Sequence, residues 1–209
     1  IGQADPANGL PINFAVLFSE PMSGFTSADV VITGTATGTI TAVVTGGGTT
    51  YNVAVSGVTG SGTVIASIPA NVATDASGNG NTASTSVDNI VLYDITRPTV
   101  TINQDIAQAD PTGTSPINFA VVFSEPVSGF TAADVALGGT AGATTAVISG
   151  GGAVYNVAVS GMVGSGTVIA TVNAGGATDL ANNTNLASTS TDNTVTYDIS
   201  ALSVTINQA

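Results

Sequence analysis

The side chains of this sequence that could do chemistry are acidic, and they recur in two matching sets. The first set is Glu20, Asp29, Asp75 and Asn79. The second set follows about a hundred residues later and is Glu125, Asp134, Asp179 and Asn183. Carboxylate and amide oxygens, in a chain without His or Cys, are the ligands that Ca²⁺ takes. Asp and Asn beside Gly are also ordinary turn residues, so a calcium site and simple turns both remain open interpretations.

Catalysis is not predicted from these residues. The absence of Cys and His removes thiol nucleophiles and the commonest general base. The pairs Glu20–Asp29 and Glu125–Asp134 have the residue types of a glycosidase. However, the chain has no Trp, and its few Phe and Tyr residues fall on expected inward strand positions. No aromatic platform for a sugar is therefore expected, and the chain is predicted not to be an enzyme.

The charge balance excludes several partners. One basic residue stands against 13 acidic ones, for a net charge of −12. Nucleic acid and anionic lipid both require clustered Lys and Arg, so neither is expected to bind. No apolar run approaches the roughly 18 to 20 residues of a membrane helix, so this segment is not expected to insert into a membrane. Low charge and abundant Gly, Thr and Ser favour an extracellular or cell-surface location.

The sequence contains two copies of one module. "QADPANGLPINFAVLFSEPMSGFTSADV" from Gln3 matches "QADPTGTSPINFAVVFSEPVSGFTAADV" from Gln108, and "YNVAVSG" recurs from Tyr51 and Tyr155. Self-similarity at a fixed period indicates repeated domains. We predict one repeat over residues 1–95, a second over 96–199, and a linker with the first strand of a further repeat over 200–209.

Within each copy the hydrophobic pattern has a period of two. In "INFAVLF", Ile12, Phe14, Val16 and Phe18 alternate with smaller or polar residues, as in a strand with one buried face. Gly-rich stretches separate such runs. We expect about seven short strands per repeat, starting near residues 100, 12, 29, 40, 51, 63 and 89. The predicted fold class is all-β: tandem immunoglobulin-like sandwiches arranged end to end.

The expected strand order places the acidic residues at the ends of the sandwiches. The two acidic sets lie in the loops at one end of each repeat, and Asp5 and Asp94 lie at the other end. If the repeats stack in line, Asp5 and Asp94 of the first face Glu125, Asp134 and Asp179 of the second, with Asn183 beside them. Ca²⁺ at this joint is the expected cofactor, and no other cofactor is expected.

The ends of the sequence suggest a mode of association. The first copy lacks the "TVTIN" that begins the second, and "SVTINQA" at the C-terminus has no module after it. The chain could be an excerpt of one long protein. Alternatively, Val204, Thr205, Ile206 and Asn207 could complete a neighbouring copy by strand donation, which would give a filament. The expected partners are further copies of the chain or adjacent repeats.

The stretches "INFAVxFSEPxSGFTxxDV", "YNVAVSG", "GTVIA" and "ATDxxGN", together with the closing "YDIT", resemble the bacterial Ig-like repeats of large secreted and cell-surface proteins. This resemblance covers nearly the whole chain twice. It implies a stalk, spacer or adhesive arm, and in cadherin-like relatives it implies calcium between domains. A structural fibre or adhesin stalk is therefore the expected function, and a ligand- or glycan-binding adhesion module is the alternative.

Overall fold

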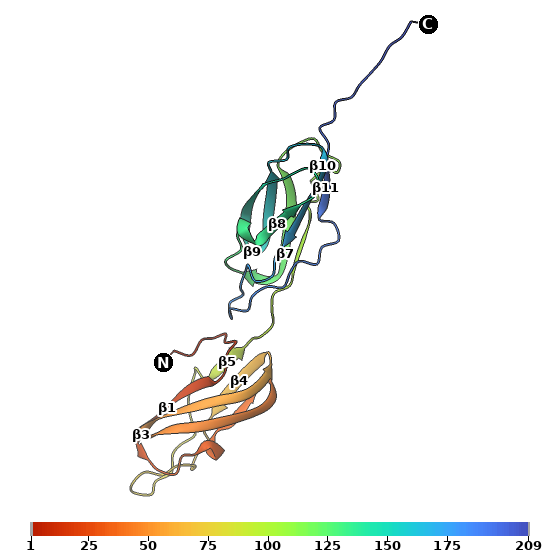
Figure 1. The fold of residues 1–209 in the computed structure, drawn as a ribbon. Helices are drawn as coiled ribbons and strands as arrows, with labels where there is room; N and C mark the ends of the chain where they lie inside the picture. Colours follow the sequence, from red (N-terminus) through yellow and green to blue (C-terminus); the bar gives the residue numbers. More distant parts are fainter. Residues whose placement is uncertain (1, 209) are drawn as a thin grey trace. The chain divides into compact units, whose positions relative to one another are not determined.

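The protein is described by a computed structural model that covers residues 2–208. Ile1 and Ala209, which the predicted segments 1–95 and 200–209 include, lie outside the described residues. The chain divides into two compact units, Ile1–Thr96 (unit 1) and Arg97–Ala209 (unit 2) (Figure 1). Within residues 2–208, the paired strands are antiparallel, and the helical content is two single 3₁₀ turns. The all-β prediction is confirmed, and so is the prediction of tandem Ig-like sandwiches.

The described part of unit 2 contains six strands and one short 3₁₀ helix. They are β6 (Val100–Gln104), β7 (Ile117–Val127), η2 (Ala132–Asp134), β8 (Val135–Gly138), β9 (Thr145–Ser160), β10 (Gly166–Val172) and β11 (Thr194–Tyr197). One sheet has the order β6-β7-β9 and the other β11-β10-β8. β9 doubles back at Gly150, which has a φ of +104° and lies against the Val154 carbonyl. When the two arms of β9 are counted separately, this unit has seven strands, as in an Ig-type sandwich.

Unit 1, as far as it is described, repeats this arrangement with one strand fewer. It contains β1 (Ile12–Met22), η1 (Ser27–Asp29), β2 (Val31–Gly34), β3 (Thr37–Gly60), β4 (Gly62–Ser67) and β5 (Ile90–Tyr93). Its sheets are β1-β3 and β2-β4-β5. The expected strand from Asp29 is corrected by two residues, because Asp29 closes the η1 turn and the strand begins at Val31. Glu20, expected in a loop, lies in β1.

The strand alternation seen in the sequence produces the core. In β7, Ile117, Phe119 and Val121 are fully buried, whereas Val122 is 47% exposed. Residues of both sheets of unit 2 join in one hydrophobic cluster, to which β6 contributes Val100 and Ile102. Burial of apolar surface of this extent is the main stabilising contribution to such a sandwich.

The core of unit 1 is less continuous. Its buried residues form two separate clusters, one around Ile12 and Val53 and one around Phe25 and Tyr51. Val16 is half-buried, whereas its counterpart Val121 in unit 2 is fully buried. Among residues 2–208, no strand in unit 1 takes the place that β6 has in unit 2. The partly buried residues Val16, Val30 and Val44 pack against both clusters of unit 1.

Candidate functional site

The loops that carry Asp75 and Asp179 fold in the same way in the two units. Asp179 accepts hydrogen bonds from the backbone amide of Asn183 (2.8 Å) and from its side-chain amide (2.9 Å). Asp75 accepts the same two bonds from Asn79, both at 2.8 Å. These bonds hold the pKa of the Asp75 carboxyl below its ordinary value of 3.8, with the Asn79 side chain as the largest cause. In both places the acidic side chain therefore closes a turn by accepting bonds from the Asn four residues on, and at Asp75 the amide of Ser77 donates a further bond at 2.8 Å, as in an Asx turn.

The acidic residues before β2 and β8 also have a local structural role. Asp29 accepts hydrogen bonds from the amide and the hydroxyl of Thr26, both at 2.7 Å. Asp134 accepts the same bonds from Thr131, both at 2.8 Å. In each case the Thr hydroxyl oxygen also accepts a hydrogen bond from the backbone amide of the acidic residue, and this second bond completes a capping box. Asp29 and Asp134 are thus engaged in shaping the turn that leads into the next strand.

Asp5 and Asp94 are both held within unit 1. The Asp5 carboxylate accepts a hydrogen bond from the Leu92 amide at 2.9 Å, and Asp94 accepts bonds from the Ser61 hydroxyl and the Thr96 amide. Unit 2 repeats the second arrangement at Asp198, where the hydroxyl and the amide of Ser200 lower the pKa of the carboxyl. These groups fix the chain as it leaves the last strand of each unit.

One pair of predicted ligands comes together within unit 2. A carboxylate oxygen of Glu125, in β7, lies within 4.8 Å of one of Asp179, in the loop before β11. Asp179 is 5% exposed, and its bond from Asn183 brings a third predicted ligand to the same place. Asp134 is not part of this group. Asp5 and Asp94 belong to unit 1, so the facing of the two acidic sets remains a prediction.

Arg97 and Asn185 have roles that the sequence did not reveal. The guanidinium of Arg97 donates hydrogen bonds to the carbonyl oxygens of Thr184 (2.7 Å) and Asn185 (2.9 Å). Asn185 is fully buried, and its side chain bonds the Ala177 amide and the carbonyls of Asn173 and Leu186. The only sequence signal for Asn185 is its counterpart Asn81, which makes matching bonds in unit 1.

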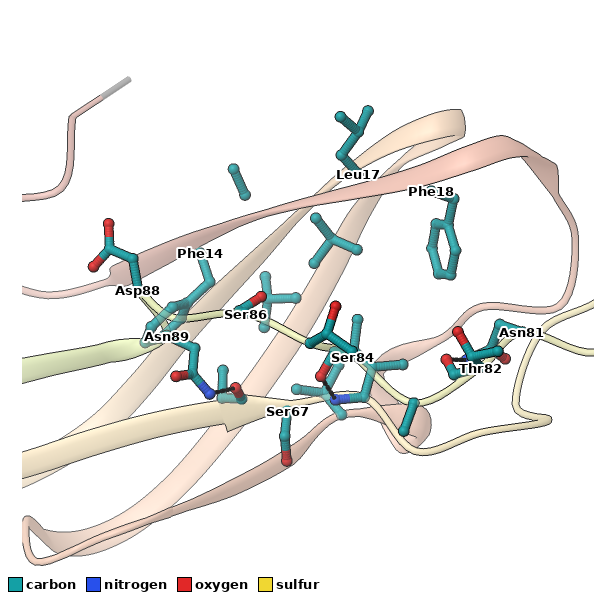
Figure 2. A pocket seen from close by; sticks show the side chains of 18 of the residues that line it. Phe14, Leu17, Phe18, Ser67, Asn81, Thr82, Ser84, Ser86, Asp88 and Asn89 are labelled. Carbon is teal, nitrogen blue, oxygen red and sulfur yellow. Dashed lines mark hydrogen bonds between the residues drawn. The ribbon is translucent and has the colours of Figure 1, made fainter.

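A groove runs along β1 in unit 1. It has a volume of about 930 Å³. One wall is β1, and the other is the segment from Asn81 to Asn89. Figure 2 shows Phe18 beneath the β1 ribbon, on the groove side, and Leu17 on the opposite side. The polar groups along the other wall include Ser84 and Ser86, and the apolar floor includes Val16 and Ile68.

The groove of unit 1 corresponds to a filled position in unit 2. There, β6 pairs with β7 along its whole length, from Val100 opposite Phe123 to Gln104 opposite Phe119. On its other side, the Val100 carbonyl accepts a hydrogen bond from the Thr189 amide at 3.1 Å. In unit 1, β1 pairs with β3 alone. The groove is therefore a strand-shaped space with hydrogen-bonding groups on both sides.

The sequence profile of a family described as "Bacterial Ig-like domain" matches residues 3–92 and again residues 94–199. Neither a curated protein nor a solved structure matches the chain. Among residues 2–208, no helix is long and apolar enough to cross a membrane.

Proposed function

Because the chain belongs to the bacterial Ig-like domain family, we propose that it is a structural segment of an extracellular bacterial fibre or adhesin stalk. Domains of this family are structural, and they are typical of surface proteins. The observation that carries the proposal is the use of the acidic residues. In both units they brace turns and strand exits through local hydrogen bonds. Acidic residues that are used in this way stabilise the backbone conformation of the domain, which is the role expected in a structural segment.

The location on the cell surface has a direct test. The full-length parent protein, detected on intact bacteria with an antibody against these two units, should be accessible without permeabilisation. Mild treatment of whole cells with a broad-specificity protease should remove the signal. A signal that appears only after lysis would contradict the surface location. A tryptic digest is unsuitable for this purpose, because Arg97 is the only basic residue and Pro98 follows it.

We propose strand addition as the means by which such units join into a fibre. The support for it is the groove along β1 in unit 1 and the exposed segment after β11, in which Val204 and Ile206 are more than 90% exposed. The alternative is one continuous chain. The mass of the native fibre subunit under denaturing conditions separates the two: donation predicts 20.2 kDa, and a continuous chain predicts a much larger species.

Calcium binding is a second, separable part of the proposal. The closeness of the Glu125 and Asp179 carboxylates in unit 2 supports it, since two neighbouring negative charges favour a bound cation. Millimolar Ca²⁺ should raise the melting temperature above that in chelator, and Glu125→Gln should abolish this difference while the Asp179–Asn183 turn remains. Equal melting temperatures with and without Ca²⁺ would remove calcium from the proposal.

An adhesion module that binds a glycan is the competing function. The segment from Glu125 in β7 to Asp134 in η2 is the candidate surface for it. The aromatic rings work against this function, because Phe123, Phe130 and Tyr155 pack edge to face with one another and do not form a flat platform. Binding on a glycan array that is lost on substitution of Glu125 would favour adhesion over the stalk.

A further inference from the structure

Unit 1 carries an apolar cluster on the outer face of its sheet β2-β4-β5. This cluster, which we call the outer patch, consists of Val31, Ile65, Ile90 and Leu92. We propose that the outer patch is a docking site for a protein partner whose own surface has an apolar centre edged by Lys and Arg side chains. The stalk function does not depend on this site, which adds a binding role to it.

The pairing of the strands brings the four side chains of the outer patch together. Ile65 in β4 lies opposite Ile90 in the adjacent strand β5, and Leu92 follows Ile90 by two residues on the same face (Figure 1). Val31 in β2 lies opposite Ser67, which is two residues from Ile65 along β4. Direct and diagonal neighbours on one face of a sheet are roughly 5 to 8 Å apart. The outer patch is therefore continuous across the three strands.

The outer patch faces away from the core. Val91, between its two residues in β5, is buried in the core cluster, whereas Ile90 and Leu92 are 47% and 43% exposed. Val31 is also 43% exposed, and Ile65 is half-buried. Contiguous apolar side chains on a surface mark sites of interaction, whereas single ones are common on any surface.

Unit 2 has the same sheet without the patch. Three of the four positions carry smaller or polar side chains there, namely Ala136 for Val31, Thr194 for Ile90 and Thr196 for Leu92. The backbone pairing is the same, since Ile169 of β10, the counterpart of Ile65, lies opposite Thr194 of β11. The module thus folds with Thr on this face, so the large apolar side chains of unit 1 are available for a role other than the stability of the sandwich.

The charges around the outer patch determine the kind of partner that fits it. Residues 1–96 contain acidic side chains and no Lys or Arg. Asp88 lies two residues before Ile90, and Asp94 lies two residues after Leu92. The carboxylate of Asp5 accepts a hydrogen bond from the Leu92 amide at 2.9 Å. Basic side chains at the edge of a partner complement this rim, whereas a second copy of unit 1 would bring like charges to it.

The acidic rim recurs in unit 2, which allows charge and apolar contact to be separated. Its members there are Asp110, Asp192 and Asp198. Asp110 accepts a hydrogen bond from the Thr196 amide at 2.9 Å, as Asp5 does from the matching amide of unit 1. A cation attracted by charge alone should bind both units alike. A partner that also needs the apolar centre should prefer unit 1.

A synthetic peptide of the proposed chemistry tests the site on the whole chain. The probe is a short peptide of alternating Lys and Leu, and the controls replace its Lys by Glu or its Leu by Ser. In an NMR titration at low salt, the probe should shift the amide signals of β4 and β5 more than those of β10 and β11. Neither control peptide should reproduce this preference.

Two variants exchange the outer patch between the units. Ile90→Thr/Leu92→Thr installs the residues that unit 2 carries at these positions and should weaken the binding of the probe by about tenfold or more, because the exposed halves of two large apolar side chains no longer gain from burial. The reverse variant, Ala136→Val/Thr194→Ile/Thr196→Leu, should bring the probe to β10 and β11. The dispersed signals of the other strands show that each variant is folded.

Several results would overturn the inference. They are no binding of the probe, equal binding of the peptide with Ser for Leu, equal shifts in both units of the unchanged chain, and unchanged binding by Ile90→Thr/Leu92→Thr. A dimer of the unchanged chain in analytical ultracentrifugation that this double variant abolishes would also overturn it, because the patch would then be covered by a second copy. None of these results would alter the resistance of the units to mechanical unfolding, so the stalk function is tested separately.

Discussion

At the residue scale, the chain uses its carboxylates mainly as hydrogen-bond acceptors for nearby backbone amides. Asp75, Asp94, Asp134 and Asp179 each fix a turn or a strand exit. A carboxylate that accepts two or three such bonds is stabilised in its charged form. This explains how a protein with a net charge of −12 and one basic residue can keep its acidic side chains close to the backbone.

The Asp75 carboxyl provides a test of this role. NMR titration should give it a pKa below 3.8, and Asn79→Ala should raise that pKa toward 3.8, because the largest cause of the shift is lost. With a lowered folded-state pKa, the contribution of Asp75 to stability is present above pH 3.8 and is lost as the pH falls through the folded-state pKa. An unchanged titration in Asn79→Ala would show that the Asn79 side chain does not hold the carboxylate.

Asn185 should be among the most sensitive polar residues of unit 2. Asn185→Ala leaves the buried Ala177 amide without its side-chain partner, and it removes the part-buried bonds to the carbonyls of Asn173 and Leu186. Each buried group left without a bond costs about 1–3 kcal/mol, so a loss of at least ~2 kcal/mol in the free energy of unfolding is expected. Urea denaturation measures it, and the exposed variant Leu180→Ala is the control. Equal stability of both variants would contradict the role.

At the element scale, the difference between the units is β6. Its residues Val100 and Ile102 belong to the single core cluster of unit 2, whereas the buried residues of unit 1 form two clusters. Unit 1 should therefore unfold at a lower urea concentration than unit 2. Hydrogen exchange of peptides from each unit, recorded in increasing urea, should show two transitions in that order. A single shared transition would contradict the separate cores.

One substitution in β6 separates the contributions of the two units. Ile102→Ala removes a fully buried side chain, and changes of this kind cost about 2–5 kcal/mol. The transition of unit 2 should move to lower urea by a corresponding amount, and that of unit 1 should stay in place. Val154→Thr, at a position 58% exposed, should change the stability by less than about 0.5 kcal/mol. A shift of both transitions by Ile102→Ala would show that the units share one core.

Much of this architecture could be predicted at the scale of elements. The alternation in "INFAVLF" predicts β1. The repeated "YNVAVSG" predicts the part of β3 that begins at Tyr51 and the part of β9 that begins at Tyr155. The strand expected near Asp29 begins two residues later, at Val31, because the bonds between Thr26 and Asp29 that shape the η1 turn have no periodic signature. Arg97 and Asn185 were missed because their partners lie 87 and 88 residues away or in irregular loops, which a local pattern does not reveal.

At the scale of the whole molecule, the central claim is that two like sandwiches fold separately and bear load in series. Force spectroscopy on the full chain, held at its two ends, measures this directly. The account predicts two unfolding events, each with a gain in length of about 300 Å, since about 95 residues extend to ~3.3–3.6 Å each. Unit 1 should yield first. One event spanning the whole chain, or extension without any force peak, would contradict the claim.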